Sequence, residues 1–452
     1  MINKSGFKFH LKNKPFALEL VFVALISSIK LFVILFFLPD ELTIYAVDES
    51  GYLENVRALV EQVKSYDISL TSLPNSSLAF GTQSTLIPAT LFSLLGINEL
   101  LSIRLTSWLY ATLSLLVLIN LISLRNGKEF ANIYVFRFSQ TLFNIAYLAI
   151  VSLTPSSFLW SVLGLRETAV IFGTILCANG TYRIAREKSQ SSKWTSYQIG
   201  FMLVFVSLII LSTSREIMAS AVFFVLIIPT IIYTFRKYSL FPLVIAALFL
   251  IISMTLAHSY ANNDSQENQK NRVSMAIRDV AKTKDYFTVE SIRQSQNKRS
   301  ENANLSIWNE DCFKINFENV NAAFNATECF VKNIARGLLG PSPFEKNLSR
   351  IASMAAFENL WWLALYLTFF CSLTSLLLKR KLDFFMFQLA FFVIAYYLIL
   401  IALSGSIGSI HRHKATVLWM IVFVCHRALA NTNSFSTKNV NESERTRKKE
   451  LH

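Results

Sequence analysis

Long apolar segments recur along almost the whole chain, and this feature limits the possible folds more than any other. Each segment holds roughly 17 to 23 residues, enough for an α-helix to cross the hydrocarbon core of a bilayer, which is about 30 Å thick. Lipid offers no partner to an open backbone, and the segments lack the period-two alternation of a membrane barrel. Hydrophobic residues make up 53% of the 452 residues, which is too apolar for a soluble domain of this size. The sequence therefore predicts an all-α polytopic membrane protein.

The apolar segments predict about ten transmembrane helices. The first segment is longer than a signal-peptide core and lacks a small-residue cleavage site, so we expect it to remain as a spanning helix. A weaker apolar stretch, 84–96, is interpreted as an interfacial or re-entrant helix, because counting it as a span would disturb the charge pattern. The expected spans are 16–38, 98–122, 132–152, 167–183, 196–212, 217–235, 240–257, 356–378, 384–404 and 409–428.

The basic residues lie mainly in the short hydrophilic gaps that follow every second expected span. Lysine and arginine are enriched in cytoplasmic loops, so this distribution predicts that both termini are cytoplasmic. Topology thereby accounts for the formal net charge of +14. We expect membrane lipids, and no nucleic acid, among the partners.

Changes in composition divide the chain into four parts. The first is an N-terminal transmembrane module that includes the first outer loop, 39–97. A segment rich in Asn, Ser and Gln forms a small outer subdomain, in which Cys312 and Cys329 could form a disulfide if the compartment is oxidising. A C-terminal group of transmembrane helices and a basic cytoplasmic tail follow. The four parts are 1–257, 258–355, 356–428 and 429–452.

Four charged sites fall on the outer side of the membrane in this topology. Arginine binds phosphate through two parallel hydrogen bonds, so the grouping predicts an outward-facing cavity for an anion. Alternatively, each basic residue could snorkel, cap a helix or pair locally. Two nearby histidines are interpreted as interfacial polar residues, because neither has a companion at zinc-ligand spacing. The four sites are Asp48-Glu49, Arg166-Glu167, Arg215-Glu216, and Arg412 with Lys414, and the histidines are His411 and His413.

The acid pair Asp48-Glu49 lies in the stretch YAVDESGYLENVRALVE, whose apolar residues follow helical spacing. One interpretation is an amphipathic surface helix with Asp48 as its N-cap. The other is functional, because a carboxylate at this place can take a proton from an acceptor hydroxyl or bind a divalent metal such as Mg or Mn. Together with cations that hold a phosphate leaving group, the acid pair predicts group transfer from a polyprenyl phosphate in the bilayer.

The pattern Asp48-Glu49-x-x-Tyr52 in the first outer loop resembles the GT-C membrane glycosyltransferases that use polyprenyl-phosphate sugars. The stretch 80–105 is similar to the approach to the second span in that group. The resemblance implies a GT-C-like core, with Asp48 as the catalytic carboxylate, Glu49 as its partner and Arg412 as a phosphate ligand. The other candidates for binding substrate or phosphate are Tyr52, Arg166, Arg215 and Lys414.

Four further segments resemble, more loosely, bacterial surface-polysaccharide membrane proteins. That group includes glycosyltransferases and repeat-unit polymerases. The chain departs from the better-known GT-C enzymes because only three expected spans and a short tail follow the outer subdomain, where those enzymes have a large soluble C-terminal domain. The four segments are PSSFLWSVLGLRE, which ends at Glu167, GLLGPSP at 337–343, ENLWW at 358–362, and GSIHRHK, which ends at Lys414.

These features predict a glycosyltransferase in the inner membrane of a bacterium. It would move a sugar from a polyprenyl-phosphate-linked donor to a cell-surface glycan or lipid acceptor on the outer face. One alternative is an O-antigen or exopolysaccharide repeat-unit polymerase, in which the arginines matter most and the acid pair is incidental. Another is a flippase or transporter of a lipid-linked glycan, which is disfavoured because transporters often show internal repeats and midplane sites.

Overall fold

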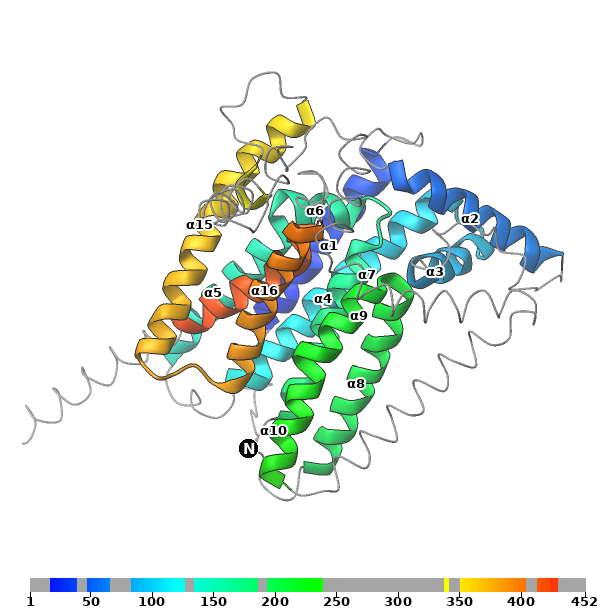
Figure 1. Ribbon diagram of the computed structural model, residues 1–452. Helices are drawn as coiled ribbons and strands as arrows, with labels where there is room; N and C mark the ends of the chain where they lie inside the picture. The colour runs from blue at the N-terminus through cyan, green and yellow to red at the C-terminus, as the bar shows by residue number, and fades with distance from the viewer. Residues whose placement is uncertain are drawn as a thin grey trace, which may run out of the picture.

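The computed structural model describes residues 17–38, 47–65, 83–126, 134–185, 193–238, 337–340, 350–403 and 413–429. Within these ranges every regular element is a helix, which confirms the expected all-helical class (Figure 1). A helix at 413–429 is called the C-terminal helix below. The other helices are α1 (Ala17–Phe36), α2 (Val47–Lys64), α3 (Gln83–Leu94), α4 (Glu99–Asn126), α5 (Tyr134–Leu153), α6 (Pro155–Val162), α7 (Glu167–Ala185), α8 (Lys193–Ser214), α9 (Glu216–Val222), η5 (Phe223–Ile227), α10 (Ile228–Tyr238), α15 (Arg350–Leu378) and α16 (Phe384–Leu403).

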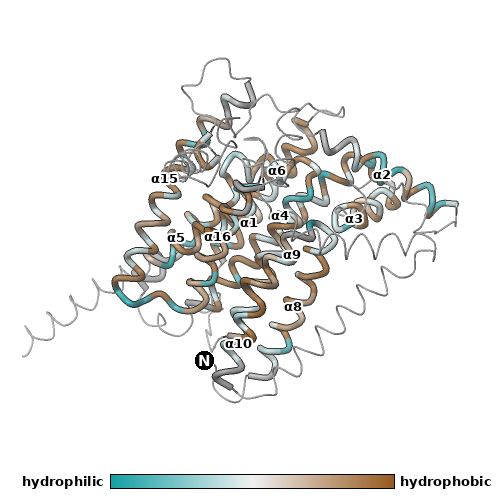
Figure 2. The backbone as a smooth tube through the Cα atoms, viewed as in Figure 1, coloured by the Kyte–Doolittle hydropathy of each residue, from teal (hydrophilic) through white to brown (hydrophobic). Residues whose placement is uncertain are grey.

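Several of these helices have the length and composition of membrane spans, and apolar residues dominate them (Figure 2). The pair formed by α5 and α6 is bent by 63° at a break and counts as one further candidate. The chain is thus a helical, membrane-embedded protein, whereas the expected total of ten spans stays a prediction. The expected span 240–257 and most of the outer subdomain lie outside the described residues. Within the described ranges, the four single helices that qualify as spans are Ala17–Phe36, Glu99–Leu124, Thr195–Ser214 and Ala355–Leu378.

The first expected outer loop contains two helices. α2 buries Tyr52, Val56 and Val60 on one face, which confirms the amphipathic helix. It begins at Val47, so Asp48 lies in the first turn and the expectation that it is the N-cap is wrong. α3 has 12 residues, which are too few to cross a bilayer, in agreement with the interfacial or re-entrant helix expected there.

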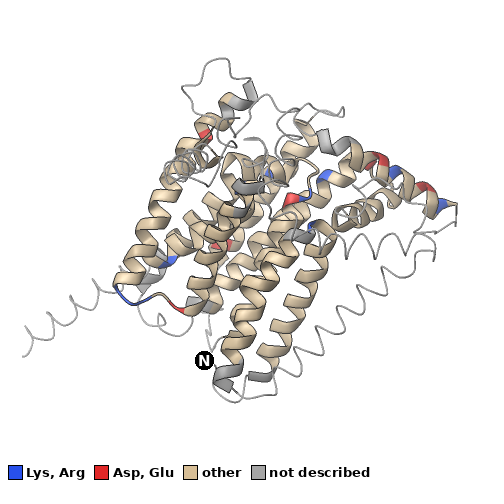
Figure 3. Cartoon of the chain, viewed as in Figure 1, with Lys and Arg blue, Asp and Glu red and all other residues tan. Residues whose placement is uncertain are grey.

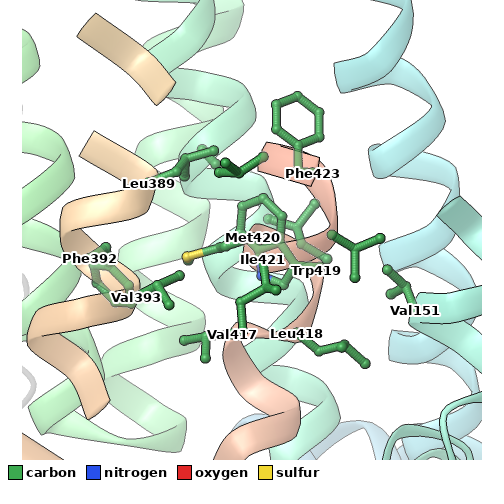
Figure 4. Close-up of a cluster of buried hydrophobic side chains, with 14 of the residues drawn as sticks. Val151, Leu389, Phe392, Val393, Val417, Leu418, Trp419, Met420, Ile421 and Phe423 are labelled. Atoms are coloured by element: carbon green, nitrogen blue, oxygen red, sulfur yellow. The ribbon is translucent and has the colours of Figure 1, made fainter. Parts of the chain in front are cut away.

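Two helices form the centre of the bundle. Nearly all of α7 is buried, and the C-terminal helix is buried around its whole circumference for most of its length. Side chains that are buried on every side of a helix must be covered by other parts of the protein. Figure 4 shows Val417, Trp419 and Ile421 projecting in different directions, with side chains of α5 and α16 around them. The indole N–H of Trp419 donates to Thr174 Oγ1 at 3.1 Å, which joins the C-terminal helix to α7.

α7 and α8 approach each other closely at glycines. A Cβ atom placed on Gly180 would lie 2.6 Å from the carbonyl oxygen of Gly200, and one on Gly200 would lie 2.9 Å from that of Gly180. Small residues of this kind let helix backbones come together, and the gain is van der Waals contact that lipid cannot supply equally well. The two glycines therefore fix α8 against the central helix.

The π-helical turn η5 joins α9 to α10. A π-helical turn departs from the regular i to i−4 hydrogen-bond ladder, so some of its carbonyls need other donors. Gln388 of α16 provides one, because its Nε2 donates to the carbonyls of Val225 and Leu226 at 3.3 and 3.1 Å. The same atom lies 3.1 Å from Thr230 Oγ1. The side chain of Gln388 thus stabilises the irregular turn inside the bundle.

Gly180→Leu is expected to lower the free energy of unfolding by about 1–3 kcal/mol, because α7 and α8 must separate to admit the side chain. Thermal unfolding of the purified protein in detergent, followed by tryptophan fluorescence, measures the effect. Met202→Leu on the exposed face of α8 is the control and should unfold like the wild type. Equal stability of the Gly180→Leu variant and the wild type would contradict the close packing.

Candidate functional site

Lys414 lies at the beginning of the C-terminal helix and is completely buried. Its Nζ donates to the carbonyl oxygen of Leu338 at 2.8 Å and to Oδ1 of Asn359. The same ammonium lies 5.6 Å from the centre of the Trp362 ring, a distance at which a cation is attracted to the aromatic face. Lys414 therefore joins three segments that are far apart in the sequence.

Glu358 supplies the negative charge near this lysine. Its Oε1 accepts hydrogen bonds from the backbone N–H of Ser156 at 3.2 Å and from the indole N–H of Trp362 at 3.0 Å. The charges of Glu358 and Lys414 are close enough to act on each other. Ser156 lies in the first turn of α6, where a helix favours an anion because its N–H groups are unpaired. The carboxylate of α15 thus anchors the short helix α6.

Arg215 forms a second contact with the C-terminal helix. It lies between α8 and α9, and its guanidinium nitrogens Nη1 and Nη2 are each 2.8 Å from a ring nitrogen of His413. A guanidinium can only donate, so the imidazole accepts at the ring nitrogen that carries no proton. The hydroxyl of Tyr396 donates to the backbone carbonyl of His413 at 3.5 Å, and the charges of Arg215 and Glu167 both act on this tyrosine.

Arg166 and Glu167 lie at the start of α7, and Glu167 is buried. Ser107 of α4 donates to the carbonyl oxygen of Leu165 at 3.1 Å, which fixes the segment that leads into Arg166. Leu165 also belongs to a cluster of buried apolar side chains that includes Tyr52 of α2. The helix that carries the acid pair therefore packs beside the segment that carries Arg166.

These contacts lie at one end of the bundle, where α1 and α8 end and α4, α7 and α9 begin. We call it the α6 end. Figure 3 shows that charged residues are sparse along the long helices and more frequent on α2, around α6 and in the turn between α15 and α16. The charged groups of α2 and of that turn are largely exposed, whereas burial removes those around α6 from water, so each of these needs a partner within the protein or in a ligand.

The structure brings together only part of the expected site. Arg215 contacts His413 of the C-terminal helix, and the next residue of that helix, Lys414, contacts Asn359 of α15. Lys414 is completely buried, and its ammonium group donates to protein oxygens. Tyr52 is buried against apolar residues at the α6 end. The side chains of Asp48, Glu49 and Arg412, and the cysteines Cys312 and Cys329, lie outside the described residues.

Several buried charged residues at the α6 end were not expected from the sequence. Glu358 and Lys30 lie inside apolar segments, and Arg104 lies in the first third of α4. The signal that could have found them is the presence of an ionisable residue within a span, since such residues usually face the bundle interior. Asn359 carries no charge and could not have been found in this way, although it lies in the segment ENLWW that the sequence resemblance had singled out.

A metal site remains a prediction. Among the described side chains, no group of three or more His, Cys, Asp or Glu residues could hold a metal ion. The proposed ligands Asp48 and Glu49 have side chains outside that set, so neither Mg nor Mn is tested there. The described cysteines Cys177, Cys371 and Cys425 are free thiols.

Comparisons with protein-family models, with curated proteins and with solved structures found no match to this chain. The resemblances drawn from short sequence motifs therefore stay expectations. The arrangement of charged side chains at the α6 end is the feature that points to a function.

Lys414→Met is expected to lower the free energy of unfolding by about 1–3 kcal/mol, because two buried oxygens lose their donor and Glu358 loses its nearby positive charge. Glu358→Gln in addition should restore part of that loss, since the uncompensated negative charge is then removed. Thermal unfolding of the two single variants and the double variant measures the coupling. Lys64→Met at the exposed end of α2 is the control. Strict additivity of the two changes would show that the pair does not interact.

Proposed function

We propose that this chain is a membrane-embedded glycosyltransferase that takes a sugar from a polyprenyl-phosphate donor at the outer face of the inner membrane. The observation that carries the proposal is the cluster of buried and half-buried charged side chains at the α6 end, where the half-buried Arg215 and the buried Lys414 lie near the buried Glu167 and Glu358. Burial of so many ionisable groups within a membrane bundle is costly and usually marks a functional site.

In the proposed reaction, the bond between the sugar anomeric carbon and the phosphate oxygen breaks, and the acceptor oxygen forms a new bond to that carbon. The electron pair of the broken bond stays on the polyprenyl phosphate. Asp48 takes the proton of the acceptor hydroxyl, with Glu49 as its partner. Arg166, Arg215 and Arg412 are the proposed partners of the phosphate, because a guanidinium stabilises its growing charge.

Lys414 is assigned a different role in this proposal. Its ammonium is engaged with Leu338 and Asn359, so it is better suited to hold the elements of the site together than to bind the phosphate itself. Tyr52 contributes to the position of α2, and thus of the acid pair, through its place in the apolar cluster. A divalent metal bound by Asp48 and Glu49 would supply additional positive charge for the phosphate.

A repeat-unit polymerase is the second candidate, and one observation favours it. The four segments that resemble surface-polysaccharide membrane proteins are far apart in the sequence, yet they contribute neighbouring residues to the network around Lys414. These residues are Ser156, Leu338, Glu358 and Lys414. In a polymerase the basic residues would bind a lipid diphosphate, and the acid pair of α2 would not be needed.

Mass spectrometry of lipid-linked and surface glycans can separate the two candidates. The comparison uses cells that carry the wild type, a deletion, Asp48→Asn, or the control Glu61→Gln on the exposed part of α2. The transferase proposal predicts that one sugar is missing from the glycan in the deletion and in Asp48→Asn, because both lack the general base. Glu61→Gln should resemble the wild type.

Two other outcomes would contradict the transferase. If the deletion shortens the glycan without changing its composition, and Asp48→Asn restores full length, the protein is a polymerase. If the deletion leaves the amount, composition and length of every glycan unchanged, neither enzyme is supported.

A further inference from the structure

Lys30 is a charged residue in the middle of an apolar helix. It lies on the buried face of α1 and is only 3% exposed, whereas Leu25, Ile29 and Phe32 face outward. At about 1.5 Å per residue, it lies roughly 9 Å before the end of α1 at Phe36. The ammonium group is therefore directed into the bundle at a depth where the surroundings are apolar.

None of the described residues neutralises the charge of Lys30. Its Nζ lies 5.7 Å from the centre of the Phe158 ring on α6, and no hydrogen bond or ion pair joins it to the described residues. Among the described residues three carboxylates are buried, and one of them, Glu167, lies at the start of α7 and has interactions of its own. Glu19 is eleven positions earlier on α1 and accepts a hydrogen bond from Asn144, and Glu358 accepts from α6 and α15. A cation–π contact alone offsets only part of the cost of burying an ammonium group.

Arg104 lies at nearly the same level on the neighbouring helix α4. The side chains of Trp108 and Thr112 contact Ser27 of α1, with the indole N–H 2.8 Å from its carbonyl oxygen and Thr112 Oγ1 3.0 Å from its hydroxyl. α1 and α4 run in opposite directions (Figure 1). About one helical turn from this contact toward the α6 end, the chain reaches Lys30 on α1 and Arg104 on α4. Residues four apart share a helix face, so Arg104 lies on the face of α4 that contacts α1. Arg104 is 3% exposed.

α1, α4 and α6 pack against one another, so Lys30 and the face of the Phe158 ring lie at their junction, and Arg104, which has interactions of its own, adds positive charge on the adjoining face of α4. An anion that carries more than one charge-bearing oxygen complements such a junction, and a phosphate offers several strong acceptors. The depth of Lys30 in an apolar segment favours a phosphate that is attached to a lipid chain over one that is free in water.

We propose that Lys30 binds the phosphate of a membrane lipid at the junction of α1, α4 and α6, with the positive charge of Arg104 nearby favouring the anion. This proposal rests on the proposed function in one respect: the lipid is expected to be the polyprenyl phosphate that the enzyme uses. Lys30 is then a substrate-binding residue of the same end of the bundle, in addition to the arginines named above. Phe158 holds the ammonium in place through its ring, and α6 forms one wall of the site.

Binding of undecaprenyl phosphate to the purified protein in nanodiscs, measured by native mass spectrometry, tests the proposal without any assay of sugar transfer. Lys30→Met should reduce the affinity at least tenfold, because the variant keeps the length of the side chain and loses the charge. Lys30→Arg should retain most of the affinity. Lys379→Met in the exposed turn after α15 is the matched control and should bind like the wild type.

The melting temperature of the same samples separates binding from folding. Because Lys30→Met removes a buried charge, it should melt no lower than the wild type in the absence of the lipid phosphate. Added undecaprenyl phosphate should raise the melting temperature of the wild type and not that of Lys30→Met. Inorganic phosphate should produce no such rise, since the proposal commits to a lipid-borne phosphate.

Several results would overturn the proposal. If Lys30→Met binds undecaprenyl phosphate as tightly as the wild type, Lys30 is not a ligand, although the proposed function survives. If Lys30→Met and Phe158→Leu both melt well below the wild type, Lys30 serves the fold through its aromatic contact. If inorganic phosphate stabilises the wild type as strongly as the lipid does, the site is not specific for lipids. If the wild type does not bind the lipid phosphate, the proposed function fails as well.

Discussion

A charged side chain buried in a membrane bundle must find its partner within the protein or in a ligand, and the arrangement of the α6 end depends on this constraint. Lys414 meets it through Asn359, the carbonyl of Leu338 and the ring of Trp362. Glu358 meets it through the N-terminus of α6 and the same tryptophan. Each of these contacts joins different parts of the bundle. The hydrogen bonds that compensate the buried charges therefore also hold the helices together.

The apolar packing makes these contacts possible. α7 and the C-terminal helix are enclosed by other helices, and glycines bring α8 against α7. Because the C-terminal helix is held in the centre, its first residues His413 and Lys414 reach Arg215 on one side and α15 on the other. The bend of 63° between α5 and α6 lets α6 leave the direction of α5, and Trp361 of α15 contacts Thr154 at this break. Polar residues of several helices therefore lie around the short helix α6.

The sequence predicted the parts of this structure that depend on local patterns. Runs of apolar residues predicted helices, and the spacing of Tyr52 and its neighbours predicted the amphipathic α2. Arg215 and Lys414 were expected at one end of the bundle because positive charges indicate topology. The partners of these residues could not be predicted, since Asn359 and Lys414 are 55 positions apart and the sequence does not specify which helices pack together.

The buried position of Lys30 and the π-helical turn η5 were not predicted, for two different physical reasons. Lys30 was overlooked because a span is recognised by its average hydropathy, which does not show which way one residue faces. The π-helical turn η5 depends on Gln388, a residue of a distant helix, so local sequence could not indicate it. The charges of the α6 end are proposed to bind a lipid-borne phosphate. Cryo-electron microscopy of the protein in nanodiscs with undecaprenyl phosphate would show where the phosphate binds. We expect phosphate density within hydrogen-bond reach of Lys30, Arg104, Arg166 or Arg215. Phosphate bound at the opposite end of the bundle, beside Glu19 and His426, would overturn the proposal.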